Sequence, residues 1–147
     1  MLVPGHVLVL SGPNLAALGS REPEIYGSTT LADISTQLQT LGDTLGLSVE
    51  CRQSDHEGEL VGWLHEASRA GWDVVLNPAA FTHYSYAVRD ACAHRTGMGS
   101  RLVEVHLSNP AARESFRRTS MVAGVATGTV AGFGADSYLL ALRALAG

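Results

Sequence analysis

The sequence has few of the features that mark membrane-spanning, disulfide-bonded or nucleic-acid-binding proteins. None of its apolar runs approaches the roughly 20 residues that a helix needs to cross a bilayer. Only two cysteines occur among 147 residues, Cys51 and Cys92, and no CxxC motif is present. Ten basic residues against 14 acidic ones give a net charge of −4. This balance argues against a nucleic-acid backbone as the main partner.

Three further absences narrow the class of protein. Two isolated cysteines are typical of reduced thiols in a cytoplasmic protein. Residues 1–12 are apolar but lack the basic region and cleavage site of a signal peptide, so we expect the first strand there. The histidines show no HExxH spacing and no cluster with cysteine, so we expect no metal site. The glycine-rich run 131–136 lacks a third glycine, where Ser137 stands, and we expect no nucleotide site.

The apolar residues that are present alternate between two patterns. Hydrophobic residues make up 46% of the chain and charged residues 16%, as in an ordinary globular protein. Short runs rich in valine and leucine predict strands at 6–11, 47–53, 73–78, 101–108 and 126–133. Amphipathic stretches predict helices at 30–45, 57–71, 84–95, 111–118 and 136–147. No linker or internal repeat divides residues 1–147, so we expect a single catalytic domain.

This order of elements predicts an α/β fold. Strand–helix alternation implies a parallel sheet with helices on both faces. Five strands in a chain of this length favour a flavodoxin-like sheet with the order 2-1-3-4-5. Thr30, three residues before Asp33, resembles a capping signal for the first long helix, and Gly71 predicts the end of the second.

Ligands of such sheets bind beyond the carboxyl ends of the strands, so the residues that follow strands 1, 3 and 4 are the first candidates. These segments are rich in polar and ionisable side chains. The connection after strand 1 is about 18 residues long, a length typical of functional lids. We expect one rim to gather Asn14, Arg21, Tyr26, Asn77, His83, His106, Ser108, Arg113 and Arg117.

Each candidate also has a purely structural explanation. His106 ends an apolar strand, where histidine is often structural, although its ordinary pKa suits acid–base chemistry near neutrality. Arg113 and Arg117 lie four residues apart, and we expect them on one helical face. That face is either a solvated basic surface or an anion pocket. Structural explanations serve equally well for the other two: Asn77 as a residue that caps backbone groups, and His83 as a residue that precedes a helix.

Four blocks of the sequence, taken together, resemble the type II 3-dehydroquinate dehydratases. They occur in the family's order and spacing and, with residues 127–146, cover essentially the whole chain. The blocks are GPNLAALGSREPEIYG (12–27), RQSDHEGELVGWLHEA (52–67), NPAAFTHYSYAVRDA (77–91) and VEVHLSNPAARESFRRTS (103–120).

The resemblance implies a flavodoxin-like fold, with trimers assembled into a dodecamer of identical chains. It also implies a reaction that uses neither a cofactor nor a metal. Members of the family remove water from 3-dehydroquinate to give 3-dehydroshikimate, by anti elimination through an enolate. The implied partners are therefore a small-molecule substrate and further copies of the chain, with no nucleic acid and no membrane.

The resemblance also implies a role for particular residues. Tyr26 matches the base that takes the proton from C2, and Arg21 the lid residue that activates it. His106 matches the acid that protonates the departing C1 hydroxyl, and Asn14 the residue that steadies the enolate with an ordered water. The implied substrate-binding positions are Asn77, His83, Ser108, Arg117, the backbone of Leu107 after His106, and Asp90 from a neighbouring subunit, with Glu104 and Arg113 in support.

Some positions depart from the family pattern, but none removes a catalytic group. Ser11 and Ala16 or Ala17 stand where the family usually has asparagine or another polar residue. Ser137 replaces a glycine, and residues 96–100 resemble a small insertion. Pro110 replaces an aliphatic residue beside the implied carboxylate site, where it affects the substrate's affinity more directly than the type of reaction.

A tyrosine base requires a closed lid. The ordinary pKa of tyrosine is near 10, so a tyrosine that acts as a base at pH 7 needs a pKa lower by about 3, or roughly 4 kcal/mol. A guanidinium about 4 Å away supplies about 1 kcal/mol in bulk water but about 4 kcal/mol at an effective dielectric constant of 20. We therefore expect one water-excluding loop to bring Arg21 and Tyr26 down together.

Two other functions remain open for a chain with this pattern. One is a non-catalytic flavodoxin-like module that binds a small carboxylate. Such a module has no use for a base opposite an acid. The other is a flavin or phosphate carrier, which needs a Ser/Thr/Gly-rich loop after strand 1. The chain has Pro13, Asn14 and Leu15 there.

Overall fold

The computed structural model describes residues 5–20 and 22–147. Five strands form one sheet in the order β2-β1-β3-β4-β5, and every neighbouring pair is parallel. The predicted order 2-1-3-4-5 is therefore confirmed. The strands are β1 (Gly5–Ser11), β2 (Leu47–Gln53), β3 (Asp73–Asn77), β4 (Leu102–His106) and β5 (Gly128–Ala131).

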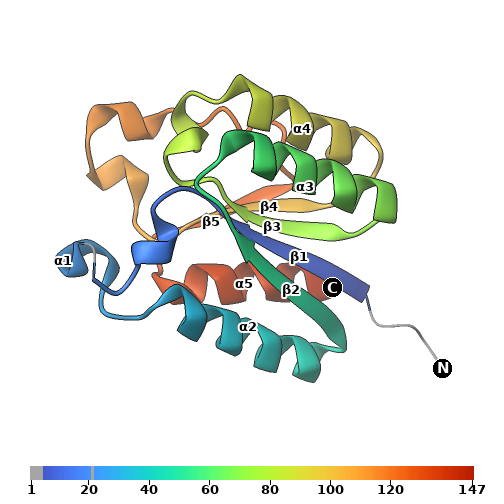
Figure 1. Cartoon of the computed structure of the whole chain (residues 1–147), viewed down its shortest axis with the longest axis horizontal. Helices are drawn as coiled ribbons and strands as arrows, with labels where there is room; N and C mark the ends of the chain where they lie inside the picture. The colour runs from blue at the N-terminus through green and yellow to red at the C-terminus, as the bar shows by residue number, and fades with distance from the viewer. Residues whose placement is uncertain (1–4, 21) are drawn as a thin grey trace.

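Helices cover both faces of the sheet, as predicted for a flavodoxin-like fold (Figure 1). Figure 1 shows α2 and α5 on one face and α3 and α4 on the other. The four helices begin and end within two residues of the predicted ranges. They are α2 (Leu31–Leu45), α3 (Glu57–Ala70), α4 (Tyr86–Gly97) and α5 (Ala135–Ala146).

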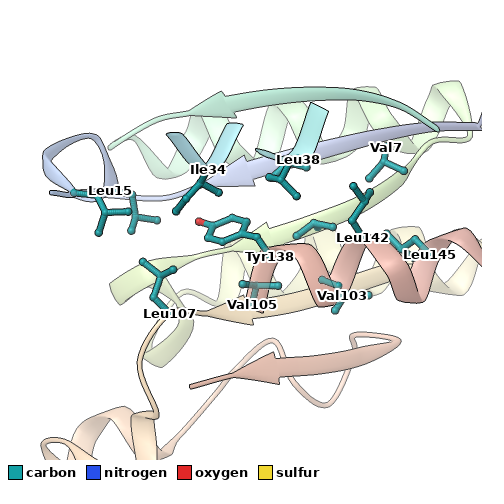
Figure 2. Packing of buried hydrophobic residues seen from close by; sticks show 14 residues of the cluster. Val7, Leu15, Ile34, Leu38, Val103, Val105, Leu107, Tyr138, Leu142 and Leu145 are labelled. Atoms are coloured by element: carbon teal, nitrogen blue, oxygen red, sulfur yellow. The ribbon is translucent and has the colours of Figure 1, made fainter. Parts of the chain in front are cut away.

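Strand β1 is buried from both sides because its side chains alternate between two cores. Val7 and Val9 pack with α2 and α5, whereas Leu8 and Leu10 pack with α3 and α4. Figure 2 shows the first core, where the Tyr138 ring lies among aliphatic side chains and its hydroxyl points towards the end that holds Leu15. This end of the core lies beneath the carboxyl ends of the strands.

The predicted helix ends are confirmed where the sequence carries capping residues. The backbone N–H of Asp33 donates to Thr30 Oγ1 at 3.1 Å, and the backbone N–H of Thr30 donates to Asp33 Oδ2 at 3.0 Å. These two bonds form a capping box at the start of α2. Helix α3 ends at Gly71, whose φ of 73° lies in the left-handed region that glycine tolerates.

The prediction of a helix at 111–118 is wrong. Two short 3-10 helices replace it, η3 (Pro110–Ala112) and η4 (Ser115–Arg118), separated by extended backbone at Glu114 with ψ 146°. An isolated helix of this length is marginal in water, and it persists only when an apolar face is buried. The one large apolar side chain of the stretch, Phe116, is 54% exposed. Arg113 and Arg117 therefore do not share a helical face.

The long connection after β1 contains two short helical segments, η1 (Leu15–Ala17) and α1 (Pro23–Tyr26). A third, η2 (Ala79–His83), follows β3 and precedes α4. In Figure 1, α1 and the segment with η3 and η4 lie at the same end of the sheet. Across residues 5–20 and 22–147, no helix combines the length and the apolar character of a membrane span.

Candidate active site

Three segments form a pocket beyond the carboxyl ends of β1, β3 and β4. Because parallel strands end at one edge of the sheet, the residues that follow them are brought together. The first segment contributes Pro13 and the two residues after it. The second contributes the polar ends of β3 and η2, and the third contributes two arginines. The lining consists of Pro13, Asn14, Leu15, Asn77, Ala79, Ala80, His83, His106, Leu107, Ser108, Pro110, Arg113 and Arg117.

Eight of the residues predicted from the sequence line this pocket: Asn14, Asn77, His83, His106, Leu107, Ser108, Arg113 and Arg117. Glu104 is buried and contacts His106. Arg21 lies outside the described residues, and so does the side chain of Tyr26. Their predicted pairing stays a prediction.

Asp90 does not lie in the pocket of its own chain. It lies on α4 with its side chain 70% exposed, and it accepts a hydrogen bond from Arg89 Nη1 at 2.9 Å. An exposed carboxylate of this kind is accessible to another molecule. The implied contact with substrate across a subunit boundary stays a prediction.

Asn77 is fixed at the floor of the pocket by two hydrogen bonds. Its Nδ2 donates to the Tyr138 hydroxyl at 3.0 Å, and its Oδ1 accepts from the backbone N–H of Ala79 at 3.1 Å. The Tyr138 hydroxyl in turn lies 2.9 Å from Ser11 Oγ. Complete burial raises the pKa of Tyr138 to about 12, so its hydroxyl stays protonated and neutral. The amide of Asn77 is thereby held in one orientation.

The first and second segments touch at Gly12. Its backbone N–H donates to the carbonyl oxygen of Asn77 at 2.8 Å. A Cβ atom at this position would lie 2.6 Å from the carbonyl oxygen of Pro78, which is closer than side-chain atoms approach. Ala79, just beyond, has a φ of 52° in the left-handed region. The site therefore depends on a close backbone crossing that only glycine allows.

The backbone of Asn14 is held at the mouth of the pocket by Asp55. Its φ of 70° lies in the left-handed region, which asparagine adopts more readily than most residues. The backbone N–H of Asn14 donates to Asp55 Oδ1 at 2.9 Å. Gln53 Nε2 donates to the same oxygen and to the carbonyl of Gly12, each at 3.1 Å. The hydrogen bond from Asn14, and then that from Gln53, lower the pKa of Asp55.

His106 forms a pair with a buried carboxylate. The two residues are two positions apart on β4, so their side chains leave the same face of the strand. His106 Nε2 lies 2.5 Å from Glu104 Oε2, and the Glu104 side chain is 1% exposed. This contact fixes the plane of the ring and leaves Nδ1 as the nitrogen for chemistry.

His83 is oriented by a different partner. Its Nδ1 lies 2.8 Å from the carbonyl oxygen of Thr119, so the N–H of the ring is on Nδ1. The neutral ring then has Nε2 as a hydrogen-bond acceptor. The ring also meets Phe116 edge-on, with centroids 5.6 Å apart. His83 is thus suited to accept a hydrogen bond from a ligand hydroxyl.

The two pocket arginines make the rim cationic. Arg113 Nη1 donates to Ser108 Oγ at 3.2 Å. Arg117 donates through Nε and Nη2 to Glu114 at 3.0 and 3.3 Å. The hydrogen bond from Arg117 lowers the pKa of Glu114, so this carboxylate is charged at neutral pH. Two guanidinium groups and a serine hydroxyl in one segment suit the binding of a carboxylate.

A contact links the long connection after β1 to this rim. Glu22 Oε2 lies 3.8 Å from Arg113 Nη2, and Glu22 directly precedes α1. Among the described residues, no group of three metal-ligating side chains lies close enough together to hold an ion. The arrangement offers acid–base chemistry and anion binding.

Residues 5–146 match the family described as Dehydroquinase class II. The chain belongs to this family. It is 59% identical, over 96% of its length, to proteins named 3-dehydroquinate dehydratase from Kineococcus radiotolerans and Salinispora tropica, of which 94% and 96% are covered. The crystal structure of a type II dehydroquinase from Propionibacterium acnes matches with a TM-score of 0.94 at 47% identity, over 99% of each chain. The resemblance stated from the sequence is confirmed.

The structure gives three departures from the dehydroquinase pattern a local role. Ser11 Oγ contacts the Tyr138 hydroxyl that orients Asn77. Ser137 is fully buried, and its Oγ accepts a hydrogen bond from the backbone N–H of Phe133 at 3.0 Å. Pro110 begins η3, where its missing N–H costs no hydrogen bond.

Sequence reasoning missed four residues that support the pocket: Gln53, Asp55, Ser120 and Tyr138. Gln53 and Asp55 follow the end of β2, so the rule that ligands bind beyond strand ends identifies their position. Ser120 and Tyr138 lie after the segments that the rule selects. No local pattern in the sequence marks either of them.

Proposed function

We propose that this chain removes water from 3-dehydroquinate to give 3-dehydroshikimate. Its family makes it an enzyme, a hydro-lyase of the type II 3-dehydroquinate dehydratase class. The observation that carries the proposal is the pairing of His106 with buried Glu104 in a pocket that two arginines also line. A histidine for proton transfer and cations for anchoring suit the dehydration of a carboxylate-bearing substrate.

The substrate's carboxylate is assigned to the segment after β4. Ser108 Oγ accepts a hydrogen bond from Arg113, so the single hydroxyl proton of Ser108 remains for the ligand. Arg117 contributes a guanidinium, and the backbone after His106 contributes an N–H group at Leu107. Asn77 and His83, which lie at and after the end of the neighbouring strand β3, bind the remaining polar groups of the ring.

His106 acts as the acid in this mechanism. A protonated ring gives its Nδ1 proton to the C1 hydroxyl, which leaves as water. Glu104 holds the opposite nitrogen at 2.5 Å, so the ring cannot turn away from the pocket without depriving a buried carboxylate of its ion-pair partner. The role of Glu104 is therefore orientation, in the way that a carboxylate orients a catalytic histidine in other acid–base sites.

Tyr26 acts as the base, with Arg21 beside it. The phenolate takes the proton from C2, and the electron pair passes into an enolate, which Asn14 stabilises together with an ordered water. The contact between Glu22 and Arg113 supports this assignment, because it links the segment that carries Tyr26 to the pocket. Anti elimination requires that the base on this segment and the acid on β4 approach the ring from opposite sides.

The proposed route needs no cofactor and no covalent intermediate. All ten basic residues of the sequence are arginines, so no lysine amine exists to form an imine with a ketone substrate. The negative charge that develops on the substrate is met by hydrogen-bond donors of the pocket.

The dodecamer, assembled from trimers, and the cytoplasmic location stay predictions. The exposed carboxylate of Asp90 is the group through which a neighbouring subunit would reach a substrate. Light scattering on the purified chain measures the mass of the assembly. A monomer with full activity would contradict the implied role of Asp90.

The test of the proposed function is turnover of 3-dehydroquinate, followed by the absorbance of the conjugated enone product. We expect turnover by the wild-type chain and a loss in kcat of at least about 10²-fold in Tyr26→Phe, because the base is removed while the ring remains. Binding of 3-dehydroquinate without any turnover would contradict the proposal and favour a carboxylate-binding module. Near-normal turnover by Tyr26→Phe would contradict the assignment of the base alone.

A further inference from the structure

Glu104 is a buried carboxylate with a single ion-pair partner among the described residues. The residue is 1% exposed on the central part of the sheet, where an unpaired charge is costly. Across residues 5–20 and 22–147, its one ion-pair partner is His106. Another group must therefore stabilise the charge on Glu104 and fix the direction of its two oxygens.

Ser120 is that group. Its Oγ lies 3.0 Å from both Oε1 and Oε2 of Glu104. The same Oγ accepts hydrogen bonds from the backbone N–H groups of Val122, at 3.2 Å, and Ala123, at 3.0 Å. A serine hydroxyl has two lone pairs and one proton. With both lone pairs engaged by backbone donors, the proton is directed at the carboxylate.

The backbone around Ser120 is itself fixed. The backbone N–H of Met121 donates to the carbonyl of Thr82 at 2.7 Å, and the Val122 side chain is fully buried in the core beneath α3 and α4. The preceding residue, Thr119, supplies the carbonyl that holds His83. One segment, residues 119–123, therefore holds both pocket histidines in place, His83 directly and His106 through Glu104.

We propose that Ser120 is a positioning residue for the dehydration, acting through Glu104 on His106. Two backbone N–H groups polarise its hydroxyl, and the hydroxyl fixes the carboxylate that fixes the ring. Hydrogen bonds in such a chain strengthen one another. This inference rests on the proposed function, because it gives Ser120 a part in the same proton transfer.

The first experiment compares kcat and KM for Ser120→Ala and Ser120→Thr. We expect Ser120→Ala to lower kcat by about 10- to 100-fold, the range found for outer partners of functional histidines. KM should change by less than about threefold, because Ser120 does not line the pocket. Ser120→Thr keeps the hydroxyl and should recover most of the lost kcat.

Thr127→Val is the matched control. Thr127 Oγ1 accepts a hydrogen bond from the backbone N–H of Leu102 at 2.9 Å, at the opposite end of β4 from the site. Thr127→Val removes this one hydrogen bond between a hydroxyl and the backbone of β4. The Thr127 hydroxyl does not contact Glu104. We expect Thr127→Val to lower the melting temperature and leave kcat within about twofold of the wild type. An equal loss of kcat in Thr127→Val and Ser120→Ala would assign the effect to stability and overturn the inference.

A double-mutant cycle with Glu104→Gln decides whether Ser120 acts through Glu104. If it does, Ser120→Ala in the Glu104→Gln background changes kcat by less than about threefold, whereas the same change in the wild-type background has its full effect. Equal effects in both backgrounds would overturn the inference, and so would a Ser120→Ala chain with wild-type kcat beside an impaired Glu104→Gln. If the two single variants Glu104→Gln and His106→Ala both turned over substrate normally, the proposed function would be overturned instead.

Discussion

The floor and the rim of the pocket both carry charged groups, but the two regions hold them differently. At the floor, Glu104 is 1% exposed and contacts His106 at 2.5 Å and Ser120 at 3.0 Å. At the rim, Glu114 is 56% exposed and receives two hydrogen bonds from Arg117. A charge–charge contact in water is weak and easily exchanged, whereas one in a buried site is directional and costly to break.

This difference separates two tasks. Proton transfer needs an accurate geometry, and the buried floor supplies it through a carboxylate that contacts both His106 and Ser120. Capture of an anion needs a cation that can leave its current partner. The rim supplies this through Arg113 and Arg117, which are largely buried themselves but contact the exposed carboxylate of Glu114. The variants below are ordered from the largest expected effect to the smallest. The first changes the floor, the second changes the rim, and the last two change the backbone contacts that support the pocket.

At the floor, His106→Ala should lower kcat by about 10²- to 10⁴-fold, because the proposed acid for the leaving hydroxyl is lost. The measurement is kcat under saturating substrate, with circular dichroism to verify the fold. His94→Ala, an exposed histidine on α4, serves as the control and should keep wild-type kcat. A His106→Ala chain that only binds its substrate more weakly would place the acid elsewhere.

At the rim, Arg117→Ala should raise KM by about 10- to 150-fold with a smaller change in kcat. Hydrogen bonds to charged groups contribute about 1.5–3 kcal/mol, and the proposed bond from Arg117 to the carboxylate would anchor the substrate before and during the reaction. Arg118→Ala is the matched control, because its side chain is exposed and does not line the pocket. An unchanged KM in Arg117→Ala would contradict the assignment of the carboxylate site.

Beneath both regions, Gly12→Ala should lower the melting temperature by about 3–10 °C. The added Cβ would lie 2.6 Å from the Pro78 carbonyl oxygen, and the resulting backbone shift costs about 1–3 kcal/mol. Gly62→Ala on the exposed face of α3 has no atom within 4 Å of the new Cβ and should be neutral or stabilising. A Gly12→Ala chain as stable as wild type would show that the crossing can relax.

The smallest effect is expected at the mouth, where Asp55 holds the backbone of Asn14. Because the pKa of Asp55 is lowered in the folded chain, its contribution to stability is present above about pH 4, the ordinary value, and is lost as pH falls through the lowered value. The melting temperature of Asp55→Asn should therefore differ from wild type at pH 7 and converge with it at acidic pH.

Asp33 provides the comparison for Asp55. Its pKa is lowered by the capping bonds to Thr30, far from the pocket. The melting temperature of Asp33→Asn should likewise converge with that of the wild type at acidic pH, and its KM should equal the wild-type value. Asp55→Asn should instead raise KM as well. A difference in melting temperature that stays constant with pH would contradict the role given to the Asp55 hydrogen bonds.

Much of the fold could be predicted from local patterns. The short apolar runs and amphipathic stretches predicted the five strands and four of the five helices, because a doubly covered strand is apolar on both faces and a covering helix is apolar on one. The capping residues Thr30 and Asp33 marked a helix start because they interact within one turn. The position of the pocket followed from the strand ends alone.

The failed prediction at 111–118 has a physical cause. The stretch has helical spacing between Arg113 and Arg117, but its apolar side chain, Phe116, finds no core to pack against. Helical spacing without burial does not stabilise a helix of this length. Both arginines reach the pocket nevertheless, from two separate turns.

The sequence by itself determined the strands and the covering helices, because their apolar patterns are local. The order of the sheet and the edge at which polar groups gather then followed from the alternation of these elements. Only the tertiary structure decided which groups hold the site. The hydroxyl of Tyr138 meets Ser11 across 127 positions, and Ser120 meets Glu104 across 16. Such contacts form when packed layers bring distant segments together, and no spacing along the chain records them.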